Sequence, residues 1–183
     1  FGENRVQELV GKHETLTAPE GGRSSAFEGL VWHQIGTLQK NKVKYITPFV
    51  GLIHAVDQQG LLAEIDKRAA QCGRHVAVLL QMHIAQESSK FGLSPAELEA
   101  LLAALDEGEW SHVEVKGLMG MATFTSDERQ VAREFAGLRS LFEQHGTDRG
   151  WDTLSMGMSG DWRIAVDEGS TMVRIGSAIF GSR

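Results

Sequence analysis

The sequence predicts an α/β protein built as a (β/α)8 TIM barrel, with an open doubly wound sheet as the alternative. Three observations support this class. Six short apolar runs rich in Val, Ile and Leu recur along the chain, and helical segments separate them. Such alternation is typical of right-handed βαβ units in a parallel sheet. The length of 183 residues is below the roughly 250 of a typical barrel, so we expect the first strand and helix to be absent from this chain.

The expected elements follow in order along the chain. Strands are expected at residues 27–36, 52–57, 75–84, 112–121, 153–159 and 172–181. The clearest helices are expected at residues 60–73, 94–108 and 127–146, each with a glycine near its end. A further helical pattern begins at Val6, directly after Gly2 and Asn4, so the strand that feeds this turn is expected to lie upstream. We expect residues 1–183 to form one barrel domain that is incomplete at its N-terminal side.

Composition and charge exclude several kinds of partner. The formal net charge is −6 and the 18 Lys and Arg residues are scattered, which argues against nucleic acid as the main partner. No apolar run approaches the roughly 20 residues that span a bilayer, so we expect no membrane contact and a cytoplasmic location. The single cysteine, Cys72, cannot form a disulfide within the chain, and we expect it to be a packing residue.

Polar donors gather after the last two expected strands. In a barrel, functional groups lie at the carboxyl ends of the strands, and the loops after the last two strands frequently bind phosphate. Residues 155–160 and the pair Gly176-Ser177 would offer backbone amides and hydroxyls to one phosphate, with Asp161 beginning the helix behind it. Glycine-rich strand ends are also ordinary tight turns. Their occurrence on two neighbouring strands favours the phosphate site.

Several motifs together resemble one known family. The segments "FGENRVQE", "WHQIGTLQKNK", "SSKFG", "GLMGMATF" and the stretch 154–181 resemble, in order and along nearly all of the chain, the pyridoxal phosphate homeostasis proteins, the YggS/PROSC family. The resemblance implies a barrel like the N-terminal domain of alanine racemase, and it implies pyridoxal 5′-phosphate as the cofactor. It also implies a role in balancing vitamin B6 and amino acid pools, without established catalytic turnover.

The resemblance implies roles for individual residues. The cofactor-binding set that it implies is Asn4, His33, Met156, Ser159, Arg174, Gly176 and Ser177. Arg174 would lie against the pyridine nitrogen and leave it unprotonated, which weakens the electron sink that most pyridoxal enzymes use. The two serines and Gly176 would hold the phosphate, with Met156 beside them, and Asn4 would lie near the ring. His33 faces the pocket region or is a hydrogen-bonded core histidine, whereas His54 and His83 are expected to be structural because no spacing links them into a metal site.

A lysine that forms the Schiff base belongs, by the resemblance, to the first strand, upstream of residue 1. We therefore expect no catalytic residue and no metal site in this chain. Lys40, Lys42 and Lys90 lie in family-like motifs, but Lys90 in "SSKFG" is expected at the surface or the barrel mouth, and Lys116 at the wrong end of its strand. The expected partners are pyridoxal phosphate and pyridoxal-dependent apoenzymes, and the expected state is a monomer.

Three other functions stay open at this point. A pyridoxal-dependent amino acid racemase or decarboxylase of fold type III is expected to need a second, β-rich domain, for which the chain has no residues left. A barrel enzyme that acts on sugar phosphates would need paired carboxylates or a lysine at the strand ends as acid and base groups. Asp57 is the only obvious acid at the expected strand ends. An interaction protein without a ligand would leave the two Gly/Ser turns unexplained.

Overall fold

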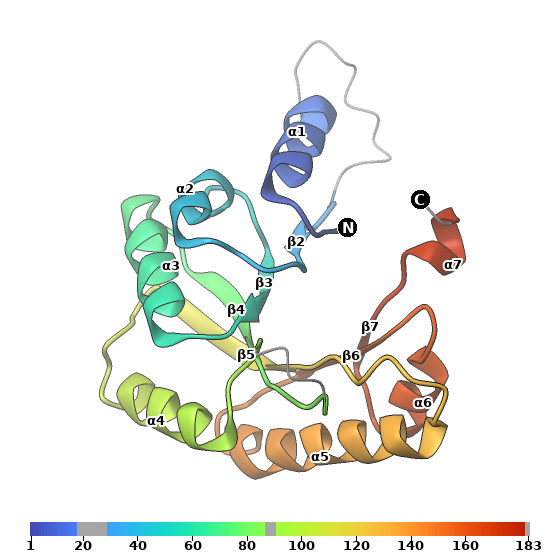
Figure 1. Ribbon diagram of the computed structural model, residues 1–183. Coiled ribbons are helices and arrows are strands. Elements are labelled where there is room, and N and C mark those ends of the chain that lie inside the picture. Colours follow the sequence, from blue (N-terminus) through green and yellow to red (C-terminus); the bar gives the residue numbers. More distant parts are fainter. Residues whose placement is uncertain (18–28, 87–90, 182–183) are drawn as a thin grey trace.

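The computed structural model describes residues 1–17, 29–86 and 91–181. Within these residues the strands form one parallel sheet in the order β1-β2-β3-β4-β5-β6-β7 (Figure 1). Their bounds are β1 (Gly2–Glu3), β2 (His33–Gln34), β3 (Leu52–Val56), β4 (Val76–Gln81), β5 (Val113–Met119), β6 (Thr153–Met158) and β7 (Met172–Arg174). Sequential parallel pairing is the arrangement of a (β/α) barrel, which confirms the predicted fold class.

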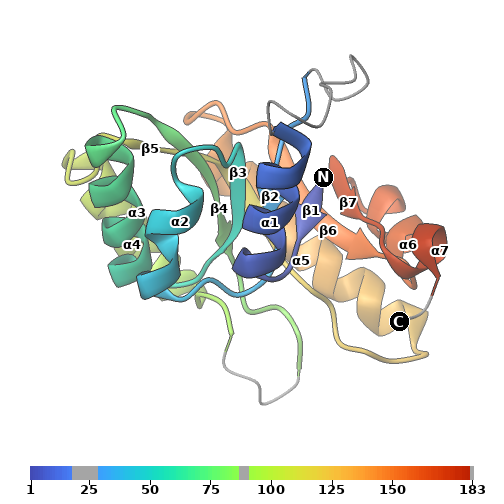
Figure 2. The same ribbon diagram turned by 90° about the horizontal axis from the view of Figure 1, so that it is seen from above.

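Helices connect the strands and cover the outer side of the curved sheet (Figure 1). Their bounds are α1 (Val6–Thr17), the short 3-10 helix η3 (Lys40–Lys42), α2 (Val43–Ile46), α3 (Gln59–Gln71), α4 (Pro95–Asp106), α5 (Glu128–Gly146), α6 (Trp162–Asp167) and α7 (Ser177–Phe180). Seen from above, α3 and α4 lie at one end of the molecule and α6 and α7 at the other (Figure 2). The seven strands form a nearly closed barrel, in which β3 and β6 contact each other across the interior although they are not neighbours in the sheet.

The helix ends follow the local sequence. Ser94 caps α4: its hydroxyl accepts from the Glu97 amide, and the Glu97 carboxylate accepts from the Ser94 amide at 2.8 Å. This is a capping box, with Pro95 in the first turn. Asp127 caps α5 through its carboxylate, which accepts from the amides of Arg129 and Gln130. The helices expected at residues 60–73, 94–108 and 127–146 are therefore confirmed, within one or two residues at each end.

Four expectations need correction. The strand that leads into the helix at Val6 was expected to be absent, but Gly2–Glu3 forms β1, which pairs with β2. Only 172–174 of the last expected strand is extended, because the amides of Ile179 and Phe180 bond back to the Gly176 carbonyl and begin α7. Of the strand expected at residues 27–36, only β2, His33–Gln34, is extended within the described residues 29–36. Cys72 is exposed at the end of α3 and does not pack in the core.

The core has an outer and an inner layer. The outer layer packs one side of the strands, such as Val78 and Leu80 of β4, against helix residues such as Leu61. The inner layer is smaller and contains strand residues only, among them Leu79 and Met119. Because side chains alternate along a strand, β3, β4 and β5 each contribute to both layers. No helix of the described residues is long and apolar enough to cross a membrane.

Candidate functional site at the barrel mouth

The turn after β6 is shaped by Gly157. Its φ is +93°, and a β carbon there would lie 2.5 Å from Cβ of Ala165 and 3.1 Å from Cα of Trp162. Only glycine accepts both the positive φ and this close approach of α6. The turn is further held by Asp161, whose carboxylate accepts from the Met158 amide at 2.6 Å. Asp161 is the N-terminal cap of α6, as the sequence predicted, so the β6 end passes directly into a helix start.

The turns after β6 and β7 meet at Ser159. Its hydroxyl oxygen accepts from the Gly176 amide at 3.3 Å and from the Ala178 amide at 3.2 Å. A β carbon added at Gly176 or Gly160 would find no atom within 4 Å, so open space lies beside both glycines. Gly176 and Ser177 are exposed, and Ser159 is half-buried. The two predicted Gly/Ser segments therefore lie side by side, with backbone amides that converge on one oxygen.

Arg174, the last residue of β7, turns its guanidinium towards β6 and the end of β5. It donates to the Ser155 carbonyl at 3.0 Å, to the Ser155 hydroxyl at 2.6 Å and to the Gly120 carbonyl at 3.2 Å. Burial lowers the pKa of Arg174 to about 10, and the charge of Asp161 opposes this shift. At neutral pH the side chain remains a cation, held on the inner side of the sheet.

A hydrogen-bonded chain continues from Arg174 across the barrel interior. The Ser155 hydroxyl lies 3.2 Å from Nδ1 of His54, and Nε2 of His54 lies 3.1 Å from Nδ1 of His33. His54 is 1% exposed, and its pKa is lowered to about 3 by burial and by the neighbouring His33 and Arg174. Burial also lowers the pKa of His33. Four strands, β2, β3, β6 and β7, thus contribute to one polar chain inside the barrel.

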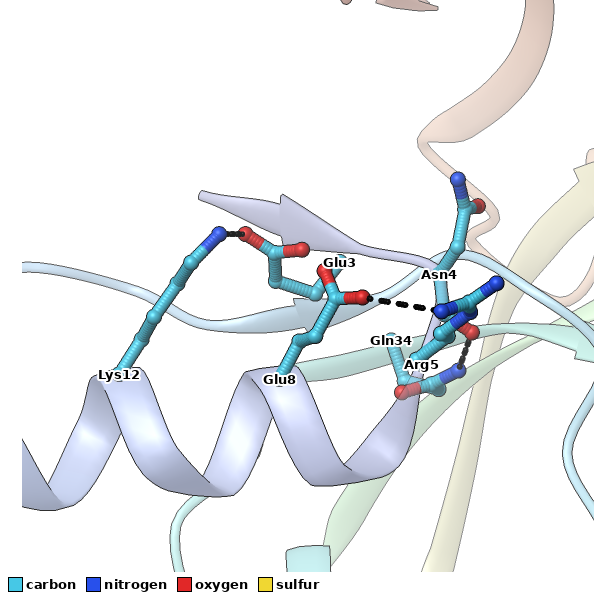
Figure 3. Close-up of polar contacts among 6 residues, drawn as sticks. All are labelled: Glu3, Asn4, Arg5, Glu8, Lys12 and Gln34. Carbon is cyan, nitrogen blue, oxygen red and sulfur yellow. Dashed lines mark hydrogen bonds and ion pairs between the residues drawn. The ribbon is translucent and has the colours of Figure 1, made fainter. Parts of the chain in front are cut away.

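The other edge of the sheet presents Asn4. The Gln34 side chain donates from Nε2 to the Asn4 carbonyl at 3.0 Å and to the Gly36 carbonyl at 3.2 Å, which joins the ends of β1 and β2. Figure 3 shows the Asn4 side chain pointing away from Gln34, and it is exposed. An ion pair from Lys12 of α1 to the buried Glu3 holds β1 against its helix (Figure 3). Asn4 therefore lies at a strand end with its backbone fixed and its amide accessible.

Not every expected site residue lies at the mouth. The Met156 side chain is fully buried in the outer core layer between sheet and helices. Successive side chains of a strand point to opposite faces of the sheet, so the Met156 side chain points outward because that of its neighbour Ser155 points inward. The Met156 side chain is therefore a packing group, and its place in the cofactor-binding set stays a prediction. Lys116 pairs with Glu114 at the start of β5, as expected for the wrong end of the strand. Lys90 lies outside the described residues.

Sequence reasoning missed two members of the polar chain. His54 was expected to be structural, and Ser155 was considered only as part of a turn. Neither carries a local signal, because their contact joins residues 101 positions apart. A cavity of about 220 Å³ adjoins the β6 turn; it is lined by Gln81, Met82, His83, Ile84, Ala85, Phe91, Met121, Ala122, Phe124 and Met158. The exposed His83 lines this cavity, and its Nδ1 lies 3.3 Å from the Phe91 carbonyl.

In parallel (β/α) barrels the loops after the last two strands frequently bind phosphate, and in this barrel those strand ends carry converging amides and a half-buried cation. The chain belongs to the family described as "Alanine racemase, N-terminal domain", whose model matches residues 1–183. It is 38% identical over 185 residues to the pyridoxal phosphate homeostasis protein of Aquifex aeolicus, covering 100% of this chain and 76% of that protein. It is 39% identical over 178 residues to the protein of the same name from Deinococcus radiodurans, with 97% and 75% covered.

Solved structures agree with this assignment. PipY of Synechococcus elongatus PCC7942, determined with PLP bound, superposes with a TM-score of 0.85 at 34% identity, covering 99% of this chain and 81% of that one. Alanine racemase of Clostridium difficile 630 superposes with a TM-score of 0.70 over 100% of this chain and 44% of that one. Its identity is 14%, so it shows the fold alone.

Proposed function

We propose that this protein binds pyridoxal 5′-phosphate at the barrel mouth and serves pyridoxal phosphate homeostasis as a carrier and not as an enzyme. Two comparisons support the proposal: the relatives at 38% and 39% identity carry that name, and PipY was solved with PLP bound. The enzyme alternative, a racemase, is supported by the description of the family model and by the 14% resemblance to alanine racemase, which concerns the fold.

The observation that carries the proposal is the convergence of two backbone amides next to the half-buried cation of Arg174 in the sequence. The Gly176 and Ala178 amides both point at the Ser159 hydroxyl, and open space lies beside Gly176. A phosphate oxygen can take the place of this acceptor and receive the same donors. Together with the hydroxyls of Ser159 and Ser177, this donor set fits the phosphate of the cofactor.

Arg174 supports a carrier function more than catalysis. Bound pyridoxal phosphate supplies an aldehyde that reacts with amines and a ring that withdraws electrons when its nitrogen is protonated. A cation next to that nitrogen disfavours its protonation, because like charges repel. Arg174 is held by Ser155 and Gly120 on the inner side of the sheet, with Asn4 and His33 at the ends of other strands of the same barrel. In this proposal the protein's own groups bind and orient the ligand, and Met156 only packs behind them.

Titration of the intact protein with pyridoxal phosphate, followed by absorbance, tests the proposal. We expect Ser159→Ala to weaken binding about tenfold or more, because a hydrogen bond to a charged group contributes about 1.5–3 kcal/mol. Ser140→Ala is the matched control, since its hydroxyl lies exposed on α5 and bonds only the Ala136 carbonyl. Equal affinities for the two variants would contradict the proposed phosphate site, and an absence of any binding would contradict the proposed function.

A further inference from the structure

The hydrogen bonds that lead from Arg174 through Ser155 and His54 to His33 allow only certain assignments of donor and acceptor. Arg174 can only donate, so the Ser155 hydroxyl oxygen accepts from it at 2.6 Å. Ser155 is completely buried, so its own hydroxyl hydrogen needs an acceptor inside the protein. The neighbour at the right distance is Nδ1 of His54, 3.2 Å away. This nitrogen must therefore lack a proton.

The same reasoning extends along the chain to His33. A neutral His54 without a proton on Nδ1 carries it on Nε2. That nitrogen lies 3.1 Å from Nδ1 of His33 and donates to it, so His33 also carries its proton on Nε2. A charged His54 would carry a second proton on Nδ1, which would face the hydroxyl hydrogen of Ser155, and the ring charge would lie near the Arg174 cation. With a neutral His54 protonated on Nε2, the hydrogen bonds from Arg174 to Ser155 to His54 to His33 all donate in the same direction.

We propose that His54 and His33 are positioning residues for Arg174: a hydrogen-bonded chain of one direction, Arg174 to Ser155 to His54 to His33, fixes the guanidinium towards the ring nitrogen of the ligand. The chain ties β7 and β6 to β3 and β2 across the interior, so the cation is oriented from the far side of the barrel. The role of these hydrogen bonds in orienting Arg174 towards a cofactor rests on the proposed function. The direction in which the hydrogen bonds donate does not.

The direction can be measured in the cofactor-free intact protein. Long-range proton–nitrogen NMR of labelled histidine at neutral pH distinguishes the two tautomers of each ring. We expect His54 and His33 both to be protonated on Nε2 only. A proton on Nδ1 of His54, or a charged His54 ring, would overturn the proposed direction.

The positioning role needs variants that separate it from ordinary packing. Ser155→Ala should speed hydrogen exchange at the Arg174 guanidinium about tenfold, corresponding to the loss of about 1.4 kcal/mol, and should release the tautomer preference of His54. Ser170→Ala is the matched control, because that hydroxyl bonds the Met156 and Met172 carbonyls on the same two strands but lies outside the chain. Equal exchange rates in the two variants would overturn the role.

A second pair of variants covers the case in which Ser155→Ala fails to fold. His54→Asn keeps an acceptor oxygen near the Nδ1 position, whereas His54→Leu keeps none. We expect Arg174 exchange, and the absorption maximum of bound pyridoxal phosphate, to change less in the first variant, which loses only the link to His33, than in the second, which loses the acceptor for Ser155 as well. Unchanged spectra in both variants, with binding intact, would overturn the positioning role. Failure of the wild type to bind pyridoxal phosphate would instead contradict the proposed function. The exchange data would still decide whether the hydrogen bonds through Ser155 and His54 hold Arg174.

Discussion

At the scale of single residues, burial decides the chemistry of the mouth. His54 is buried between Ser155, His33 and the Arg174 cation. Its pKa falls to about 3, mainly because of burial and further because of the charges of His33 and Arg174. Protonation of this ring would both place a charge in the interior and break the Ser155 hydrogen bond. The neutral ring is therefore part of the folded structure.

This neutrality predicts a pH dependence of stability. The unfolded chain takes up a proton at His54 near pH 6.5, whereas the folded protein does so only near pH 3. The unfolded state thus binds more protons in this window, and stability that is present above pH 6.5 is lost as the pH falls towards 3. We expect the free energy of unfolding to decrease by up to about 1.4 kcal/mol per pH unit from this group. Urea unfolding of wild type and His54→Asn should show a steeper slope in the wild type.

His83→Gln is the control for that experiment, because His83 is exposed. It should keep the wild-type slope between pH 6.5 and 5. If His54→Asn and wild type lose stability in parallel over this range, His54 is not the buried neutral group described above.

At the scale of elements, the passage from β6 into α6 depends on one glycine. Gly157 combines a φ of +93° with contact to α6 so close that a β carbon would lie 2.5 Å from Cβ of Ala165. The Ser159 hydroxyl, the Asp161 cap and the start of α6 at Trp162 all follow within five residues. The geometry of the mouth therefore depends on a turn in which any residue other than glycine at position 157 would be strained.

Gly157→Ala should destabilise the fold by about 1–3 kcal/mol, since it adds both backbone strain and overpacking. It should also weaken pyridoxal phosphate binding, because α6 and Ser159 must shift to make room. Gly137→Ala on α5 is the control, for a β carbon there meets nothing within 4 Å and lies away from the mouth. Urea unfolding and ligand titration check both variants, and similar losses in the two would show that the close approach at Gly157 is not the cause.

At the scale of the whole molecule, the described lysines lie away from the inner face of the sheet. Lys12 of α1 pairs with Glu3, and Lys116 pairs with Glu114 at the start of β5. The remaining described lysines lie on helices: Lys40 and Lys42 on η3, Lys44 on α2 and Lys67 on α3. Covalent capture of an aldehyde requires an amine that reaches it at the mouth. The cation at the mouth is instead Arg174, which does not form such a bond under ordinary conditions.

We predict that the 183-residue chain binds pyridoxal phosphate reversibly but does not attach it covalently, and that it neither racemises nor decarboxylates amino acids. Borohydride reduction with the cofactor, followed by peptide mass mapping, is the measurement. In a longer form that includes residues before Phe1, the adduct should map to that preceding segment. A stable adduct on Lys90, or on any other lysine of the chain, would contradict the prediction.

Local patterns in the sequence were sufficient for most of the architecture. The capping box at Ser94, the Asp127 cap and the apolar period of the long helices predicted α4 and α5 closely, because capping and periodicity act within a few residues. The short elements were less predictable. β1, β2 and α7 have four residues or fewer, and their hydrogen bonds go to partners that a local pattern does not reveal.

The sequence by itself determined the barrel class, the family resemblance and the two Gly/Ser turns, since alternating strands and helices and turn residues leave contiguous signals. Only the tertiary structure decided which of the neighbouring β6 residues faces the mouth: Ser155 points inward and Met156 packs outward, a choice of strand parity that shifts with a single residue. It also decided that His54, a histidine without any local motif, meets Ser155 from 101 positions away. The curvature of the sheet brings β3 and β6 together across the interior, and no contiguous stretch of sequence contains that contact.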